Sequence, residues 1–587
     1  MPPQVLDLRI YRAAFIPVVL ALVVVAFSLQ TRPRPLDATL PPDAFDGARA
    51  ATVANRLAER FPLRRPGSEG DLALAGEVQR TLQHAGFSVT SFDEQAETID
   101  GERTLRTVVG ERTGASSRRV VVVAHRDAAT APALAELSGT ASLLELARLF
   151  AGRTTERTLT LVSTSGGTGG AGGAAAWADR LGGSVDAVLV LGDLGGEPDG
   201  SPQVVGWSNG RGIAPQKLMR TVSEAVRRES GPPGASGPVM QWLRLAFPLT
   251  VSEQGVLDQR GIPAVLLGAS GELGPSPAEG VDETRLEGLG RAALRSITAL
   301  DAGPDVEPRE PQSVVVVRNQ ELPAWAVRLL VGVLLLPPVV TVLDGLARVR
   351  RRREPVLPWI GWVAATAVPF VIAALVAILL RLTGLVTAPG APVAPGLIPT
   401  SIPALVGIAA VFALAFALLW PRVARALALG RPDAAGAGVA VALVAIAVAV
   451  IVWLFNPFAA LFLVPAAHLW LLCGDAGSSM PRWLRLAGVL VALVPPALAA
   501  LLYGLALDAG PVALAWMGVL LVAGGHVGVV SLLLWSVVAA CAVTAIVVAT
   551  RITPAPRGPQ REEVRSRGPI SYAGPGSLGG TDSALRR

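Results

Sequence analysis

The stretch VVVVAHRDAA at Val120–Ala129 is central to interpreting the first half of the chain. Its four consecutive valines are typical of a strand that is buried on both faces of a sheet. The strand leads directly into His125 and Asp127. Because ligands of α/β proteins bind at the carboxyl ends of central strands, this pattern predicts a site at that edge. We expect His125 to be a candidate metal ligand and Asp127 to orient its imidazole. A lone histidine at a strand end is more often structural, so the pattern alone leaves metal binding open.

Similar short apolar runs recur through residues 41–303 and alternate with helical patterns. The expected strands are Thr107–Gly110, Arg119–Ala124, Leu159–Ser163, Ala187–Leu191 and Pro263–Leu267. The expected helices are Leu72–Ala85, Ala141–Phe150, Gly173–Leu181, Pro215–Arg228 and Thr284–Leu300. Alternation of this kind predicts an α/β domain with a mixed, mostly parallel sheet covered by helices on both faces.

The second half of the chain has the composition of a membrane protein. Only nine of the 45 acidic residues lie from Glu321 onward, and the mean hydropathy of the whole chain is +0.50. Residues 1–12 precede an apolar run at 13–30, which lacks a small-x-small cleavage site and is therefore interpreted as an uncleaved signal-anchor rather than a cleaved signal peptide. A linker at 304–323 leads to an all-α membrane domain at 324–550 with about seven or eight segments. Residues 551–587 are rich in Pro, Gly, Ser and Arg, which predicts a disordered tail.

The arginines predict the orientation of these segments. Arg9 and Arg12 precede the first span, and five arginines lie in the loop Ala347–Glu354, so both regions are expected in the cytoplasm. The α/β domain is then extracytoplasmic on a multi-pass cell-membrane protein. Pro511–Thr550 is long enough for two short crossings, which would place the arginine-rich tail outside, against the charge rule. A re-entrant Pro511–Gly525 would restore agreement, and the sequence leaves this choice open.

Charge and cysteine content exclude several other classes. The net charge of +6 comes from arginines scattered between apolar runs, and Lys217 is the only lysine, so no nucleic-acid partner is expected. Cys473 and Cys541 are the only cysteines. Two cysteines in apolar segments provide neither a disulfide framework nor a CxxC metal site.

Six segments, taken in order and spacing, resemble a known family of enzymes. They are RLAERFPLRRPGSEGDLALAGEVQRTLQHAGFSV (Arg56–Val89), VVVVAHRDAA (Val120–Ala129), SGTASLLELARLF (Ser138–Phe150), LTLVSTSGGTGGAGGAAAWADRL (Leu159–Leu181), AVLVLGDLGG (Ala187–Gly196) and VSEQGVLDQRGIPAVLLG (Val251–Gly268). Together they resemble the di-zinc exopeptidases of metallopeptidase family twenty-eight, over about Arg56 to Leu300. The resemblance implies a zinc-aminopeptidase-like fold. Some members of that family also continue into a multi-spanning membrane region.

The same resemblance implies that the metal site is degenerate. The family uses five metal ligands and a carboxylate base, and of the ligands only the first and fourth are matched, by His125 and Asp193. The bridging aspartate falls on Ala135, the base and its neighbouring ligand fall on Gly166 and Gly167, and the last histidine falls on Gln254. Glu136 and Glu253 each lie one residue from a lost ligand and are possible substitutes. Stable zinc sites need three or four ligands, so no cofactor is expected unless these substitutes retain zinc.

Three functions remain open from the sequence. The first is a pseudopeptidase that binds a peptide or protein outside the cytoplasm and serves as a scaffold on its membrane bundle. The second is an active metallo-aminopeptidase with an atypical metal site. The third is a transporter or lipid-handling protein with an accessory domain. Gly166 and Gly167 themselves indicate either a relaxed turn or a cleft in which backbone N–H groups contact an anionic or peptide ligand.

Overall fold

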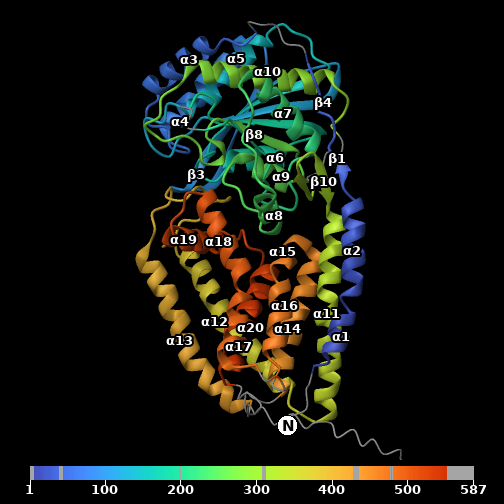
Figure 1. The fold of residues 1–587 in the computed structure, drawn as a ribbon. Coiled ribbons are helices and arrows are strands. Elements are labelled where there is room, and N and C mark those ends of the chain that lie inside the picture. Colours follow the sequence, from blue (N-terminus) through green and yellow to red (C-terminus); the bar gives the residue numbers. More distant parts are fainter. Residues whose placement is uncertain are drawn as a thin grey trace, which may run out of the picture.

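The computed structural model describes residues 6–38, 44–196, 200–306, 312–427, 435–475, 478 and 480–551. The predicted tail at 551–587 therefore lies outside the described residues, apart from Arg551. Figure 1 shows an α/β domain seated on one end of a long helical half. The chain enters through the helical half, forms the α/β domain, and then returns to build the remaining helices.

The α/β domain is built on a sheet of seven strands in the order β2-β3-β5-β4-β6-β8-β7. These strands are β2 (Ser88–Thr98), β3 (Gly101–Arg112), β4 (Ser116–His125), β5 (Arg157–Thr164), β6 (Val185–Leu191), β7 (Gln203–Val205) and β8 (Ala264–Gly268). The four central strands β5, β4, β6 and β8 run parallel, and β3 and β7 run antiparallel to their neighbours. The predicted mixed sheet, mostly parallel at its centre, is confirmed.

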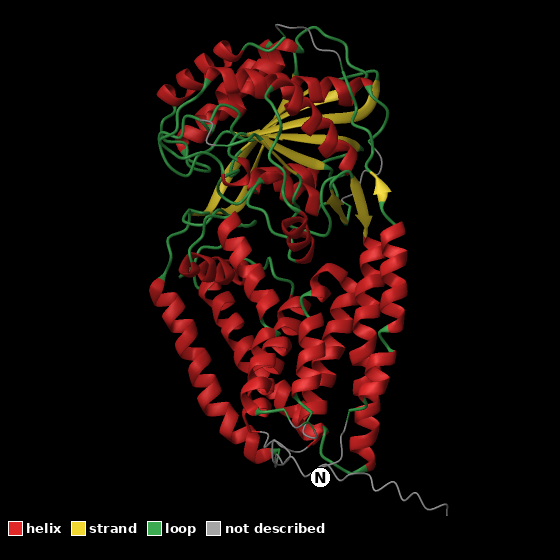
Figure 2. Ribbon diagram, viewed as in Figure 1, coloured by secondary structure: helices red, strands yellow, loops and turns green. Residues whose placement is uncertain are grey.

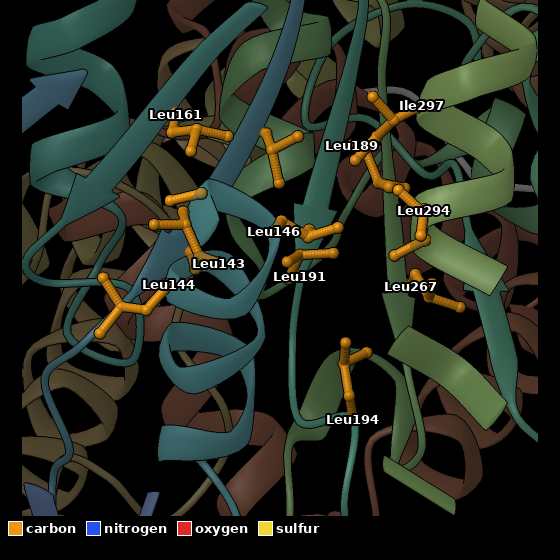
Figure 3. Packing of buried hydrophobic residues seen from close by; sticks show 14 of the residues in the cluster. Leu143, Leu144, Leu146, Leu161, Leu189, Leu191, Leu194, Leu267, Leu294 and Ile297 are labelled. Carbon is orange, nitrogen blue, oxygen red and sulfur yellow. The ribbon is translucent and has the colours of Figure 1, made fainter. Parts of the chain in front are cut away.

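Helices of the α/β domain lie on both faces of this sheet (Figure 2). They are α3 (Gly47–Arg60), α4 (Glu69–His84), α5 (Leu137–Leu149), α6 (Gly172–Arg180), α7 (Gln216–Glu229), α8 (Pro238–Ala246), α9 (Glu253–Gln259) and α10 (Glu283–Ala302). On one face Leu143 and Leu146 of α5 and Leu294 of α10 pack against Leu189 and other strand residues (Figure 3). The opposite face packs on α6 and α9, and its apolar cluster continues into the helical half.

The alternation of β4 explains how one strand serves both layers. Val120 and Val122 belong to the apolar cluster beneath α5, whereas Val121 and Val123 belong to the cluster on the other face. All four valine side chains are buried, because successive residues of a strand point to opposite faces and both faces are covered.

The helical half consists of α1 (Leu8–Ala13), α2 (Ile16–Phe27), α11 (Ala324–Arg351), α12 (Leu357–Leu382), α13 (Ile402–Ala426), α14 (Ala435–Phe455), α15 (Pro457–Leu461), α16 (Val464–Cys473), α17 (Arg482–Val491), α18 (Val494–Ala506), α19 (Pro511–Ala523) and α20 (Val529–Arg551). Within the described part of the chain, seven helical segments are long and apolar enough to cross a membrane. The last apolar run divides into α19, with 13 residues, and α20, with 23 residues, and of these two α20 alone has spanning length.

A second, small sheet joins the two halves. It consists of β1 (Gln30–Thr31), β10 (Gln320–Pro323) and β9 (Val314–Val317), all antiparallel. β1 follows α2 and β10 leads directly into α11, so the sheet ties the exit of the first candidate span to the entry of the second.

Candidate functional site

His125 is the last residue of β4 and pairs in register with Thr164 of β5. Its Nδ1 lies 3.8 Å from Oε2 of Glu253, whose Oε1 accepts a 2.6 Å hydrogen bond from the Thr164 hydroxyl. His125 Nε2 and Glu253 Oε2 are buried, and neither has a hydrogen-bond partner among the described residues. Burial favours the neutral imidazole, but the nearby carboxylates of Asp127, Glu253 and Glu136 outweigh it and raise the pKa of His125. The His125 imidazole, when protonated, and the Glu253 carboxylate therefore form a pair of opposite charges in the interior.

The Asp127 carboxylate is hydrogen-bonded to the glycine-rich turn and not to the His125 imidazole. Its Oδ1 accepts a 2.9 Å bond from the backbone N–H of Gly167, and its Oδ2 accepts a 2.8 Å bond from the Thr168 hydroxyl. No hydrogen bond joins Asp127 to His125 in the described residues, so the expected orienting contact is absent from this arrangement. Asp127 instead fixes the position of the turn.

The turn lies directly against the histidine. A Cβ atom on Gly167 would stand 2.3 Å from Cβ and 2.4 Å from Cγ of His125, which is too close for any real contact. Gly166 has φ of +80°, a backbone conformation that side chains disfavour. With this histidine position Gly167 has no room for the side chain of a catalytic carboxylate, and at Gly166 a side chain would strain the backbone.

Asp193 lies two residues beyond β6, the strand adjacent and parallel to β4. His125 and Asp193 are thus at the same carboxyl edge of the sheet. Both carboxylate oxygens of Asp193 accept hydrogen bonds from Ser270, at 3.2 Å from its N–H and 2.8 Å from its hydroxyl. Burial raises the pKa of Asp193 to about 6.

Glu136 is the residue just before α5, and it is half-buried, with its Oε2 atom enclosed. Burial raises its pKa to about 7; attraction to His125 and Arg64 opposes the rise, while repulsion from Asp127 and Asp193 adds to it. Its Oε2 is buried without a partner in the described residues. The Glu136 carboxylate therefore interacts electrostatically with His125 and Asp193.

The remaining predicted positions carry no charge. Ala135 is fully buried, and its carbonyl accepts a 2.5 Å bond from the Ser138 hydroxyl. Gln254 is also buried, and its amide N–H₂ donates to the Thr250 hydroxyl at 3.2 Å and to the Trp207 carbonyl at 3.4 Å. Neither residue provides the anionic or imidazole group that its family counterpart would.

A buried ion pair beneath the site was missed in the sequence. Arg126 Nε lies 2.9 Å from Oδ1 of Asp71, and both side chains are fully buried. Arg126 also donates to the backbone carbonyls of Ser163 and Arg106, and Asp71 accepts from the Ser165 hydroxyl at 2.6 Å. The sequence carried one indication of this pair, which is Arg126 between His125 and Asp127. Successive side chains of extended backbone point to opposite sides, so Arg126 points away from the side that carries His125 and Asp127.

The helical half contacts the turn from the other side. The loop between α12 and α13 donates from Gly390 N–H to the carbonyl of Glu97 at 3.3 Å. A Cβ on Gly170 would stand 2.5 Å from Cβ of Pro389, so the loop and the turn are in close contact. Ala391 packs with Ala171 of the turn. The edge of the sheet that carries His125 therefore faces the helical half.

This donor set does not fit a pair of zinc ions. Among the residues that the structure describes, no group of three or more His, Cys, Asp and Glu side chains could hold a metal ion. The carboxylates of Asp127 and Asp193 are already hydrogen-bonded through both oxygens, and Ala135 provides no bridging oxygen. A paired-metal centre needs a bridging ligand and several further donors around both ions.

Comparison with known proteins gives resemblance at the level of fold. No family profile matches the sequence, and no curated protein matches it. Among solved structures, a zinc aminopeptidase from Bacillus subtilis is 12% identical, with 46% of this chain and 100% of that chain covered and a TM-score of 0.37. A glutaminyl cyclase from Bacteroides thetaiotaomicron is 18% identical, covering 44% and 99%, with a TM-score of 0.37. A leucine aminopeptidase precursor from the same organism is 16% identical, covering 44% and 99%, with a TM-score of 0.36. At these values the likeness says nothing about activity.

Proposed function

We propose that the α/β domain is a peptidase-like binding or scaffold domain, attached to a membrane bundle, that does not hydrolyse peptides through paired metal ions. The observation that carries this proposal is the contact between Gly167 and His125. A Cβ on Gly167 would overlap the imidazole, so with His125 in this position the turn has no room for the glutamate that the resembled family uses as its base. Loss of a general base alone costs about two to four powers of ten in rate.

The loop between α12 and α13 supports a scaffold role. Because Pro389 and Gly390 contact the turn and the end of β2, a ligand that bound at this edge would also touch the helical half. A peptide or protein partner held there would be coupled to α12 and α13 through a single loop. We place this edge outside the cytoplasm, in agreement with the arginine pattern.

A specific observation also favours the second candidate, a metallo-aminopeptidase with an atypical site. His125 Nε2, Glu136 Oε2 and Glu253 Oε2 are all buried without hydrogen-bond partners in the described residues. Buried polar atoms usually have a partner, so each of these atoms is a position where an ion or a water could bind, although no three such side chains of the described residues gather around one metal position.

Metal content and turnover of the purified full-length protein distinguish the two candidates. The protein would be incubated with zinc, cobalt or manganese, dialysed, and assayed on aminoacyl and dipeptide substrates beside His125→Ala. We expect substoichiometric metal and no metal-dependent turnover in either protein. Stoichiometric metal with turnover that disappears in His125→Ala would establish the enzyme and refute the proposal.

A further inference from the structure

A cavity of about 780 Å³ lies between the α/β domain and the helical half. The α/β domain contributes Asn209 to Arg211 and Ala246 to Leu249, and the helical half contributes the ends of α14 and α18, with α19 and the start of α20. Its volume is within the range of about 300–1,000 Å³ that small-molecule sites occupy. No part of the candidate site around His125 lines this cavity.

The wall from the helical half is predominantly apolar. Phe455, Met517, Leu521, Leu534 and Trp535 are among its lining residues. On the opposite wall, the Phe247 ring lies 5.6 Å from that of Trp535, measured between centroids. Such a surface gains most by contact with hydrocarbon, because apolar area is favourably removed from water.

Three polar side chains on the helical-half wall of the cavity already have hydrogen-bond partners. Asn456 donates to the carbonyl of Leu245 and accepts from the N–H groups of Phe458 and Ala459. The Tyr503 hydroxyl donates to the Phe247 carbonyl, and His526 Nε2 lies 3.1 Å from the Pro389 carbonyl oxygen. Asn456 and Tyr503 thus bond to the α/β domain and His526 bonds within the helical half, which leaves Ser531 as the polar side chain that the described part of this wall can offer a ligand.

The α/β domain provides further polar groups that remain free. Arg211 lines the cavity, is exposed, and has no hydrogen-bond or ion-pair partner among the described residues. Asn209 also lines it; its Oδ1 accepts from Thr250 N–H, while its Nδ2 is buried without a partner. The cavity thus has a cationic, hydrogen-bond-donating end and an apolar end.

Two residues that line the cavity are also exposed on the outer surface of the helices. Phe455, at the end of α14, is 57% exposed, and Val530, at the start of α20, is 64% exposed, and both line the cavity. Their exposed neighbours Leu454 and Val529 are also apolar. A bilayer around the candidate spans would cover these residues, so this side of the cavity faces hydrocarbon.

We propose that this cavity binds one anionic membrane lipid. Its acyl chain lies between α14, α19 and α20, and its headgroup is bound by Arg211 and Asn209. A guanidinium with a nearby amide donor suits the oxygens of a phosphate group, and because no carboxylate of the described residues pairs with Arg211, a headgroup of net negative charge is favoured over a zwitterionic one. The inference requires the helical half to lie in a bilayer, and it is independent of what the α/β domain binds or hydrolyses.

Photo-crosslinking of the full chain in phosphatidylcholine vesicles tests the acyl-chain site. The probe is phosphatidylglycerol with a diazirine near the end of one acyl chain. We expect labelled peptides from α19 and α20, at up to one lipid per chain. Gly518→Leu should lose most of the label, because Gly518 lines the cavity and a Cβ there would meet nothing within 4 Å. Gly407→Leu on α13 is the matched control, since a Cβ there also meets nothing and Gly407 lies outside the cavity.

The headgroup is tested with a second pair of variants. Arg211→Gln should weaken labelling by the anionic probe about tenfold, and it should weaken labelling by a diazirine phosphatidylcholine probe by less, because the choline cation offsets the charge of that phosphate. Arg153→Gln, at another exposed arginine of the α/β domain, should label as the unchanged protein does.

Three results would overturn the proposal. The first is equal labelling of Gly518→Leu and the unchanged protein. The second is as much label in α13 as in α19 and α20, and the third is equal labelling by anionic and zwitterionic probes. If Gly518→Leu melts at a lower temperature than Gly407→Leu, then Ala500→Leu on α18, which also lines the cavity, replaces it and must lose the label.

Discussion

At the scale of single residues, the site is defined by close packing between His125 and a glycine turn. The two glycines could be recognised in the sequence as positions without a carboxylate. Their contact with His125 could not, because Gly167 and His125 are 42 residues apart and meet only when β4 and β5 pair in register. Absence of a side chain at Gly167 is therefore a packing requirement beside His125.

The packing requirement predicts the effect of the smallest substitution. Gly167→Ala should destabilise the protein by about 1–3 kcal/mol, because the new methyl group overlaps the His125 side chain and one of them must move. Gly76→Ala is the control: Gly76 lies inside α4, a Cβ there meets nothing within 4 Å, and alanine should stabilise that helix by about 0.5–1 kcal/mol. Apparent melting temperatures in detergent should fall for the first variant only. A Gly167→Ala protein as stable as Gly76→Ala would contradict the described turn.

Glu136 predicts how stability changes with pH. Its pKa is about 7 in the folded chain, against 4.5 for the unperturbed group, so the folded state holds a proton that the unfolded state has released. Stability must then decrease as pH rises from about 4.5 through about 7, by up to roughly 3 kcal/mol for this residue. Glu136→Gln removes that loss, and its melting temperature should exceed that of the unchanged protein at pH 8 but not at pH 4.5. The same substitution at exposed Glu59 should change neither value; a parallel shift at both pH values in Glu136→Gln would show that Glu136 is not buried as described.

At the scale of elements, the central strands could be predicted and the edge strands could not. β4, β5, β6 and β8 are short apolar runs because both of their faces are covered. β2 reads SVTSFDEQAET and contains no apolar run, since it lies at the sheet edge and forms through antiparallel pairing with β3. β7 has only three residues and depends in the same way on β8. Pairing of this kind is decided by the neighbouring strand, so a local pattern cannot indicate it.

A buried ion pair joins Asp71 of α4 to Arg126, the residue just after β4. Asp71→Ala should cost about 3–5 kcal/mol, because Arg126 would keep a buried charge without its anion. The comparison is Asp93→Ala, which breaks the exposed pair between Asp93 and Arg106 on β2 and β3 and should cost about 0–1 kcal/mol. Burial raises the pKa of Asp71 despite the attraction of Arg126, which agrees with a pair that is costly to bury and costly to break. Equal melting temperatures for the two variants would show that Arg126 finds another anion or solvent.

At the scale of the whole molecule, most arginines of the helical half lie at the end away from the α/β domain; among the described residues Arg328 of α11 and Arg381 of α12 lie at the other end. Arg348 of α11 lies 3.1 Å from Asp7 beside α1, so the start of the first candidate span meets the end of the second. The last turns of α20 pack with the first turns of α12 and α14 and with the end of α16 at that same end. The arginines concerned are Arg9, Arg12, Arg348, Arg350, Arg351, Arg352, Arg353, Arg422, Arg425, Arg482, Arg485 and Arg551. The sequence indicated these clusters separately, and the fold brings them to one end.

The arrangement of α19 also addresses the parity of the spans. α19 lies beside the upper end of α18, beneath the α/β domain, whereas α20 descends along the bundle (Figure 1). If α15 and α16 together cross once, as their combined 17 residues in Pro457–Cys473 allow, the chain crosses eight times and Arg551 returns to the arginine-rich end. This agrees with the charge rule, and it agrees with a non-crossing segment near Pro511–Gly525.

We therefore expect the α/β domain and the arginine-rich end on opposite sides of the membrane, with the α/β domain outside. Ser201→Cys places a thiol on an exposed residue of the α/β domain, and Arg351→Cys places one at the end of α11. The two native cysteines are buried, so the background should be low. An impermeant maleimide should label Ser201→Cys in intact cells and Arg351→Cys only after lysis, because the positive end of a bundle is retained in the cytoplasm. The reverse pattern would place the α/β domain in the cytoplasm. Labelling of both variants in intact cells would show that α11 does not cross the membrane. The assignment of spans in the rest of the helical half, which depends on that crossing, would then be wrong as well.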